Sequence, residues 1–163
     1  MKSFWKNKIV LVTGAGGFVG SRIVQALVEQ EAHVIAIVRK KSKKRNLLQH
    51  RNTITTIEAD LNNKKDLKKI PTNFAIVIHA AAVDGGTVFK KKHADKIFHE
   101  NVHMTMNLLE ILKRSSVKKF LFVSTAEVYT PLKNKKYITE DNFSLFAPSK
   151  PEEWYAFSKV IGE

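Results

Sequence analysis

Residues 8–20 read KIVLVTGAGGFVG, and this stretch decides the fold. An apolar run of strand length leads into a glycine-rich turn, and a segment of helical periodicity follows as far as Glu29. The order strand, glycine turn, helix predicts a dinucleotide-binding turn. In such a turn Gly14 allows the tight bend, Gly17 lets a pyrophosphate approach the backbone, and Gly20 lets the helix pack closely on the sheet. The first N–H groups of the helix then face the phosphates.

Apolar runs of strand length alternate with segments of helical periodicity along the rest of the chain. This pattern predicts an α/β fold, a Rossmann-like doubly wound parallel sheet in a single domain over residues 1–163. The expected strands are Lys8–Val12, His33–Val38, Thr53–Glu58, Ala75–His79 and Lys119–Ser124. The expected helices are Gly17–Glu29, Lys43–Gln49, Lys64–Lys69 and Ala94–Ser115, with a last helix beginning near Pro151. Residues Pro131–Pro148 are expected to form a loop over the carboxyl edge of the sheet.

The composition is that of an ordinary globular domain. A length of 163 residues with 44% hydrophobic content suffices for one buried core. No apolar run approaches the roughly 18 residues that a membrane-spanning helix needs. The chain has no cysteine, which excludes disulfides and thiolate metal sites. Because the amino terminus lacks the apolar segment of a signal peptide, we expect a cytoplasmic protein.

The net charge of +13, from 28 Lys+Arg against 15 Asp+Glu, would attract phosphates or nucleic acid. Much of it lies in short basic runs without the interleaved aromatic residues of a base-stacking surface. We interpret these runs as solvated surface and expect neither a nucleic-acid nor a membrane partner. The runs are Arg39–Lys41, Lys43–Arg45, Lys90–Lys92, and Lys133 with Lys135 and Lys136.

The end of the second expected strand bears on the choice of cofactor. An acidic residue there would hydrogen-bond the adenosine ribose of NAD, whereas this chain has Val38-Arg39-Lys40. Arg39 could pair with a 2′-phosphate, which favours NADP over NAD. The alternative is that Arg39 only opens a solvated basic loop, so NAD stays open.

Residues 99–103 read HENVH and match the HExxH signature of zinc proteases. That chemistry needs a third ligand on a neighbouring element, and the only tempting carboxylate downstream, Glu127, follows an expected parallel strand. We therefore expect no metal site, and we interpret His99 and His103 as solvated or packed side chains.

Several further segments form a recognisable set. They are Thr13–Gly20 in the form TGxxGxxG, Asp60-Leu61 after the third expected strand, His79–Ala82, Asn101–Glu110, Ser124–Tyr129, and Tyr155–Lys159 in the form YxxxK. Together they resemble the extended short-chain dehydrogenase/reductases, in particular the NAD(P)-dependent sugar-nucleotide epimerases and dehydratases. The resemblance covers nearly the whole chain but only the amino-terminal half of such proteins.

This resemblance implies roles for named residues. Thr125, Tyr155 and Lys159 would be catalytic. Tyr155 and Lys159 share one helix face, and the ammonium together with the nicotinamide would lower the pKa of the phenol and make it a general base. Thr125 would bind the substrate oxygen, and Lys159 the nicotinamide ribose. The implied cofactor-binding residues are Gly14, Gly16, Gly17, Phe18, Val19, Gly20, Arg39, Asp60, Leu61, Ala80, Ala81, Ala82, Asn101, Tyr155 and Lys159.

The implied function is an NAD(P)-dependent epimerase or reductase of a sugar nucleotide, with transient hydride transfer. Ala126-Glu127 stands where the 4,6-dehydratases of this branch carry Asp-Glu, which argues against dehydration, and residues 83–86 resemble a loop of GDP-sugar enzymes. Family members continue with two more strands and a substrate-binding region, so we expect a sheet incomplete at its carboxyl-terminal side. The alternative is a catalytically incomplete dinucleotide-binding module. The resemblance also implies a homodimer through Ala94–Ser115 and the Pro151 helix.

Overall fold

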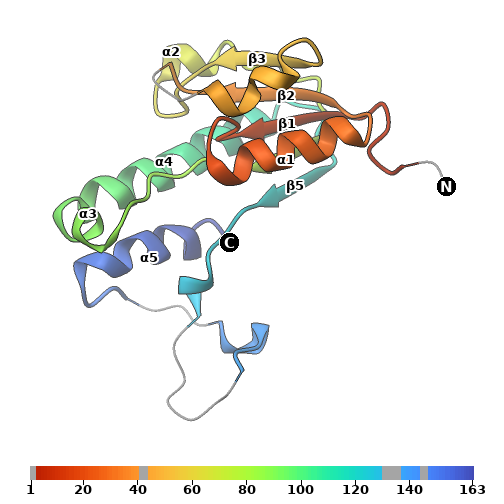
Figure 1. The fold of residues 1–163 in the computed structure, drawn as a ribbon. Coiled ribbons are helices and arrows are strands. Elements are labelled where there is room, and N and C mark those ends of the chain that lie inside the picture. The colour runs from red at the N-terminus through yellow and green to blue at the C-terminus, as the bar shows by residue number, and fades with distance from the viewer. Residues whose placement is uncertain (1–2, 41–43, 130–136, 144–146) are drawn as a thin grey trace. The chain divides into compact units, whose positions relative to one another are not determined.

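The computed structural model describes residues 3–40, 44–129, 137–143 and 147–163 (Figure 1). The chain forms two compact units, the first made of residues 1–82 and 103–123 and the second of residues 83–102 and 124–163. The long helix α4 (Ala94–Leu112) contributes to both units. Parts of the expected loop and of the basic runs lie outside the described residues, namely residues 41–43, 130–136 and 144–146.

The first unit is built on a five-stranded parallel sheet in the order β3-β2-β1-β4-β5. Each strand begins and ends within two residues of the prediction, and the parallel α/β architecture is confirmed. The central strand pairs in register on both sides, with Val12 opposite Ala36 and Ile78. The strands are β1 (Ile9–Thr13), β2 (His33–Val38), β3 (Ile54–Glu58), β4 (Ile76–His79) and β5 (Lys119–Phe122).

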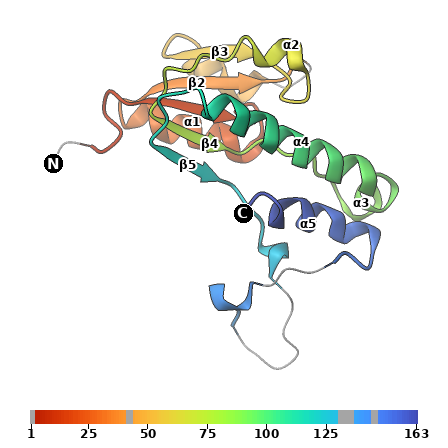
Figure 2. The same ribbon diagram turned by 180° about the vertical axis from the view of Figure 1, so that it is seen from behind.

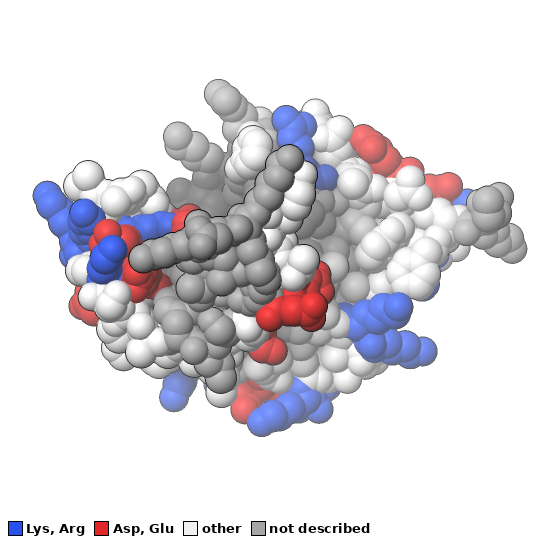
Figure 3. Space-filling view, turned by 90° about the horizontal axis from the view of Figure 1, so that it is seen from below, with Lys and Arg blue, Asp and Glu red and all other residues white. Residues whose placement is uncertain are grey.

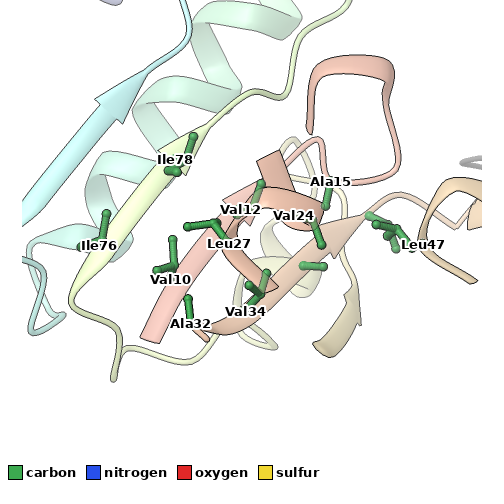
Figure 4. Close-up of a cluster of buried hydrophobic side chains, with 12 residues drawn as sticks. Val10, Val12, Ala15, Val24, Leu27, Ala32, Val34, Leu47, Ile76 and Ile78 are labelled. Atoms are coloured by element: carbon green, nitrogen blue, oxygen red, sulfur yellow. The ribbon is translucent and has the colours of Figure 1, made fainter. Parts of the chain in front are cut away.

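Helices cover both faces of this sheet. Helix α1 (Phe18–Glu29) lies on the face toward the viewer in Figure 1, and the carboxyl-terminal half of α4 lies on the opposite face (Figure 2). The α1 side of the core contains Val10, Val24 and Val34, which are at most 2% exposed (Figure 4). Because both faces are covered, the inner strands are almost continuously apolar, as parallel strands usually are.

The helical segments differ from the prediction in three places. The residues expected to form a helix at Lys43–Gln49 adopt a 3₁₀ helix, η1 (Lys44–His50), in which Leu47 is buried and Leu48 is half-exposed. One buried side chain anchors only a short element of this kind. The long helix ends at Leu112 rather than Ser115, and α2 (Lys64–Leu67) is two residues shorter than expected.

In the second unit a short helix, α3 (Thr87–Lys92), was not predicted at all. The helix expected near Pro151 is present as a 3₁₀ turn, η4 (Pro151–Glu153), that continues into α5 (Trp154–Val160). The Glu153 carboxylate accepts the backbone N–H groups of Ser149 and Lys150 and fixes this start. Two further 3₁₀ turns are η2 (Ala126–Val128) and η3 (Glu140–Asn142).

Charged side chains of both signs alternate on the face that Figure 3 presents. Ion pairs among the described residues include Lys91 with Glu152 and Lys96 with Glu100. Within the described part of the chain, no helix is long and apolar enough to cross a membrane.

Candidate functional site

The glycine turn joins β1 to α1 at the carboxyl edge of the sheet. Gly14 has a φ of 65°, a conformation that side-chain-bearing residues rarely adopt. A Cβ atom at this position would lie 2.7 Å from the carbonyl of Ala80, at the end of β4. The turn therefore requires glycine both for its backbone conformation and for its close approach to the neighbouring strand.

The other two glycines have distinct tasks. The N–H of Gly17 donates to the carbonyl of Gly14 at 2.9 Å, and Gly17 caps α1 without any side-chain hydrogen bond. The first-turn N–H groups of α1 thus lack intrahelical acceptors and suit an anion. A Cβ at Gly20 would collide with the carbonyl oxygen of Gly14. Gly20 therefore packs the helix against the turn, whereas packing against the sheet was expected.

A pocket in the first unit collects most of the predicted cofactor residues. It is lined by Gly14, Gly16, Gly17, Arg39, Leu61, Ala80, Ala81 and Ala82, together with Ile37, Val38, Ala59 and Met104, which the sequence did not single out. Ile37, Val38 and Ala59 lie at or just after strand ends, and Met104 lies on α4. In the sequence their apolar side chains indicate a buried core but not a binding pocket. Seven predicted residues lie outside this lining, among them Gly20 on α1 and the second-unit residues Asn101, Tyr155 and Lys159. Phe18 and Val19 are exposed on the first turn of α1, and Asp60 lines an adjoining depression with Arg39 and Lys40.

Buried polar contacts support the backbone of this pocket. Thr13 and His79 meet at the ends of β1 and β4, and the Thr13 hydroxyl also accepts the N–H of Ala81 at 3.2 Å. On the other side of the ring, His79 Nε2 lies 3.3 Å from the Thr105 hydroxyl. Thr13, supported by His79 and Thr105, thus binds the backbone of the Ala80–Ala82 segment. Sequence reasoning did not select these three side chains.

The second unit contains the predicted catalytic side chains. Tyr155 and Lys159 both lie on α5, with Lys159 Nζ 6.0 Å from the centre of the Tyr155 ring. Thr125 caps η2, its hydroxyl accepting the N–H of Glu127. Asn101 on α4 is buried, accepts the N–H of Val83 at 2.7 Å and donates to the Ser158 hydroxyl at 3.2 Å.

The pKa of Tyr155 differs from the expectation. Burial, and then the carboxylates of Asp84 and Glu127, raise this pKa to about 12. Burial lowers the pKa of Lys159 to about 8, against an opposing contribution from Asp84. The chain's own residues thus raise the Tyr155 pKa, because desolvation and two carboxylates favour the neutral phenol, whereas the expected lowering included the charge of a bound nicotinamide.

The burial of Lys90 differs from a second expectation. Its side chain was interpreted as part of a solvated basic run, yet the residue is only 9% exposed. Its Nζ donates to both carboxylate oxygens of Glu127, at 2.8 and 2.9 Å, and lies 3.5 Å from Asp84 Oδ1. In the sequence Lys90 is the first of three consecutive lysines, so no local signal distinguishes it from its neighbours.

A cavity of about 710 Å³ lies beside this ion pair in the second unit. This volume is within the range of about 300–1,000 Å³ that small-molecule sites occupy. Lys90 and Glu127 form one part of its wall, and Tyr129, Glu152 and Ala156 form another.

The HExxH residues do not form a metal centre in the described part of the chain. His99 and His103 are exposed on α4. The described residues contain no group of three or more His, Cys, Asp or Glu side chains arranged to hold a metal ion.

A parallel sheet whose first strand runs through a glycine turn into a helix defines a dinucleotide-binding type of α/β protein. The comparison with known proteins specifies this class further. Residues 10–163 match the sequence model of the NAD-dependent epimerase/dehydratase family, and the chain belongs to that family. The resemblance to extended short-chain dehydrogenase/reductases is thereby confirmed.

Three similar proteins are named for sugar nucleotides. A dTDP-4-dehydro-6-deoxy-D-allose reductase from Streptomyces sp. is 29% identical over 98% of this chain and 50% of its own length. A UDP-N-acetylglucosamine 4-epimerase from Methanobrevibacter ruminantium M1, solved with UDP-N-acetylmuramic acid, has a TM-score of 0.77 at 30% identity, over 95% of this chain and 48% of that one. A variant of UDP-glucuronic acid 4-epimerase from Bacillus cereus, solved with UDP-4-deoxy-4-fluoro-glucuronic acid and NAD, has a TM-score of 0.77 at 29% identity, over 94% of this chain and 49% of that one. The chain thus spans about half the length of these relatives.

Proposed function

We propose that the chain binds NADP or NAD and carries the Thr125-Tyr155-Lys159 site of a sugar-nucleotide epimerase or reductase. The observation that carries the proposal is the pocket of the first unit, where the glycine turn, the end of β2 and the Ala80–Ala82 segment converge. The family and the named relatives support the cofactor and the substrate class.

The pocket residues fit a dinucleotide. Gly14 and Gly17 leave backbone without side chains at the turn, and the amino terminus of α1 offers N–H groups to a pyrophosphate. Arg39 is exposed and lines the same pocket, and no carboxylate follows β2. An exposed guanidinium in this place suits a 2′-phosphate, which supports NADP as the preferred cofactor.

The side chains of the second unit would handle the proton and the substrate oxygen. When bound, the nicotinamide would supply hydride acceptance and donation at a sugar carbon. Tyr155 would exchange a proton between its Oη and the oxygen on that carbon, while the Thr125 hydroxyl donates a hydrogen bond to the same oxygen. The Lys159 ammonium would hold the ribose.

The high pKa of Tyr155 favours one direction of the reaction. A phenol with a pKa of about 12 is protonated at neutral pH and is ready to give its proton to a carbonyl oxygen. Proton donation to a keto sugar is the reductive direction, in line with a relative named as a reductase. We therefore propose reduction ahead of epimerisation.

A second candidate is a dinucleotide-binding module that turns nothing over. The observation in its favour is that the residues lining the glycine-turn pocket all belong to the first unit, whereas the predicted catalytic side chains belong to the second. In this case cofactor binding persists without any chemistry on sugars.

One experiment separates these candidates. The purified chain is mixed with NADPH and a panel of UDP- and dTDP-linked 4-keto sugars, and oxidation of the nicotinamide is followed by absorbance. The reductase is expected to consume NADPH, with a loss of about 10²–10⁴-fold in Tyr155→Phe. Tyr137→Phe, at an exposed position, is the matched control. Cofactor-dependent thermal stabilisation without turnover would establish the binding module, and the absence of both would overturn the proposal.

A further inference from the structure

Lys90 lies between two groups of the second unit. On one side its Nζ binds both carboxylate oxygens of Glu127, and on the other it lies 4.4 Å from the centre of the Tyr155 ring. This distance is inside the roughly 6 Å within which an ammonium is attracted to an aromatic face. One cation therefore contacts both a carboxylate and the phenol expected to transfer a proton.

The exposures of the two ionic partners are unequal. The Lys90 side chain is 11% exposed, whereas that of Glu127 is 50% exposed. A nearly buried ammonium needs a paired anion, because its desolvation is otherwise uncompensated. Glu127, in contrast, stays half in solvent, and Lys90 orients it by binding both of its carboxylate oxygens.

Four charged groups face Tyr155. Asp84 precedes α3, Lys90 lies on α3, Glu127 lies on η2, and Lys159 lies one turn along α5. Two are cations and two are carboxylates. The loss of any one group would leave the surroundings of the phenol with a net charge.

We infer that Lys90 is a positioning residue of the Tyr155 site, which fixes the Glu127 carboxylate and covers the phenol ring, and so sets how readily Tyr155 releases its proton. The inference rests on the proposed function only in the role given to Tyr155. Ionisation of the phenol is a property of the chain itself and can be measured without cofactor or substrate.

The sign of each substitution follows from charge. Lys90→Met removes a cation from the ring face and leaves Asp84 and Glu127 uncompensated, so the pKa of Tyr155 rises further. Glu127→Gln removes a carboxylate that raises this pKa, so the pKa falls. Lys90→Arg keeps the charge and leaves the pKa close to its original value. In the double variant K90M/E127Q the pKa of Tyr155 lies between its values in the two single variants.

The test is a ¹⁹F NMR titration of the whole chain labelled with 3-fluorotyrosine. Fluorination lowers the pKa of a phenol and so moves its titration to lower pH. The chain has three tyrosines, so the Tyr155 resonance is identified by its loss in Tyr155→Phe. Lys92→Met, an exposed lysine on the same helix, is the matched control.

We expect the Tyr155 midpoint to rise by about 0.5 pH unit or more in Lys90→Met and to fall by a similar amount in Glu127→Gln. In Lys90→Arg and Lys92→Met the Tyr155 midpoint should stay near that of the parent. If Lys90→Met fails to fold, the fall of the Tyr155 midpoint in Glu127→Gln serves as the test. A midpoint unmoved in Glu127→Gln, or in a folded Lys90→Met, overturns the inference and reduces Lys90 to a structural anchor, whatever the cofactor and turnover experiments show.

Discussion

The hydroxyl Oγ1 of Thr13 and the imidazole Nδ1 of His79 lie 2.6 Å apart in the interior of the first unit. The two residues are opposite one another in the register of β1 and β4. The same hydroxyl accepts the N–H of Ala81, so one side chain joins two strand ends to the backbone that lines the pocket of the first unit.

Replacing Thr13 by valine keeps the shape of the side chain and removes the hydroxyl. The buried His79 ring nitrogen and the half-buried Ala81 N–H then each lose a partner, at a cost of about 1–3 kcal/mol in the free energy of unfolding. Urea denaturation monitored by tryptophan fluorescence measures this loss. Thr13→Ser keeps the hydroxyl and should lose less. Equal urea midpoints for the valine variant and the parent would show that the contact contributes nothing.

Arg39 should decide the cofactor preference. With cofactor at 100 times its dissociation constant, binding adds about 2.7 kcal/mol to stability, which a thermal melt detects. We expect NADP⁺ to raise the melting temperature more than NAD⁺ at equal concentration. Arg39→Ala should abolish the difference, while Lys40→Ala, the adjacent exposed cation, should largely preserve it. A larger shift with NAD⁺ in the parent chain would contradict the preference for NADP.

The pKa of Lys159 predicts a pH dependence of stability. This pKa is lowered from 10.5 to about 8, so between these values the unfolded chain holds a proton that the folded chain has lost. The unfolding free energy contributed by this group therefore rises with pH from about 8 to about 10.5, and below pH 8 the full cost of burying the ammonium is present.

Lys159→Met removes that cost. At pH 7 the variant should be more stable than the parent, by a gain on the order of 2–3 kcal/mol. The gain should shrink as the pH approaches 10.5. Denaturant melts of both proteins from pH 7 to pH 10 measure the difference. A constant difference across this range would show that Lys159 is not the titrating group.

A homodimer through α4 and the Pro151 helix is the expected assembly. Met106 and Leu109 are 53% and 36% exposed on α4, which makes them suitable contact residues for a second copy. Met106→Glu should lower the mass measured by light scattering toward that of a monomer. Arg22→Glu, at an exposed position on α1, should leave the mass unchanged. A strictly monomeric parent at high concentration would make the dimer prediction wrong.

The fold was predictable because its signals are local. The apolar run of β1, the glycine turn and the periodicity of α1 lie within one continuous stretch, so each was assigned from its neighbours in sequence. The parallel order of the strands followed from the alternation with helices. Element ends were less accurate, as at Leu112, because turns and capping contacts with other segments decide them.

The candidate site was less predictable because its electrostatics are not local. Tyr155 lies far along the chain from Asp84 and Glu127, and only the folded second unit brings these charges together. Lys90 is indistinguishable in sequence from Lys91 and Lys92, yet it alone of the three is buried. Its partner Glu127 appeared as the remaining acid of a dehydratase pair and as a third zinc ligand to be weighed, with no indication that it binds a lysine.

The lining of the pocket in the first unit is completed early during synthesis of the chain. Every residue in that lining lies at or before Met104, whereas Tyr155 and Lys159 come near the end of these 163 residues. At about 5–20 residues per second, roughly 3–10 s pass on the ribosome between Met104 and Tyr155. The nascent chain therefore contains all the residues that line this pocket several seconds before Tyr155, the side chain proposed to transfer a proton, has been made.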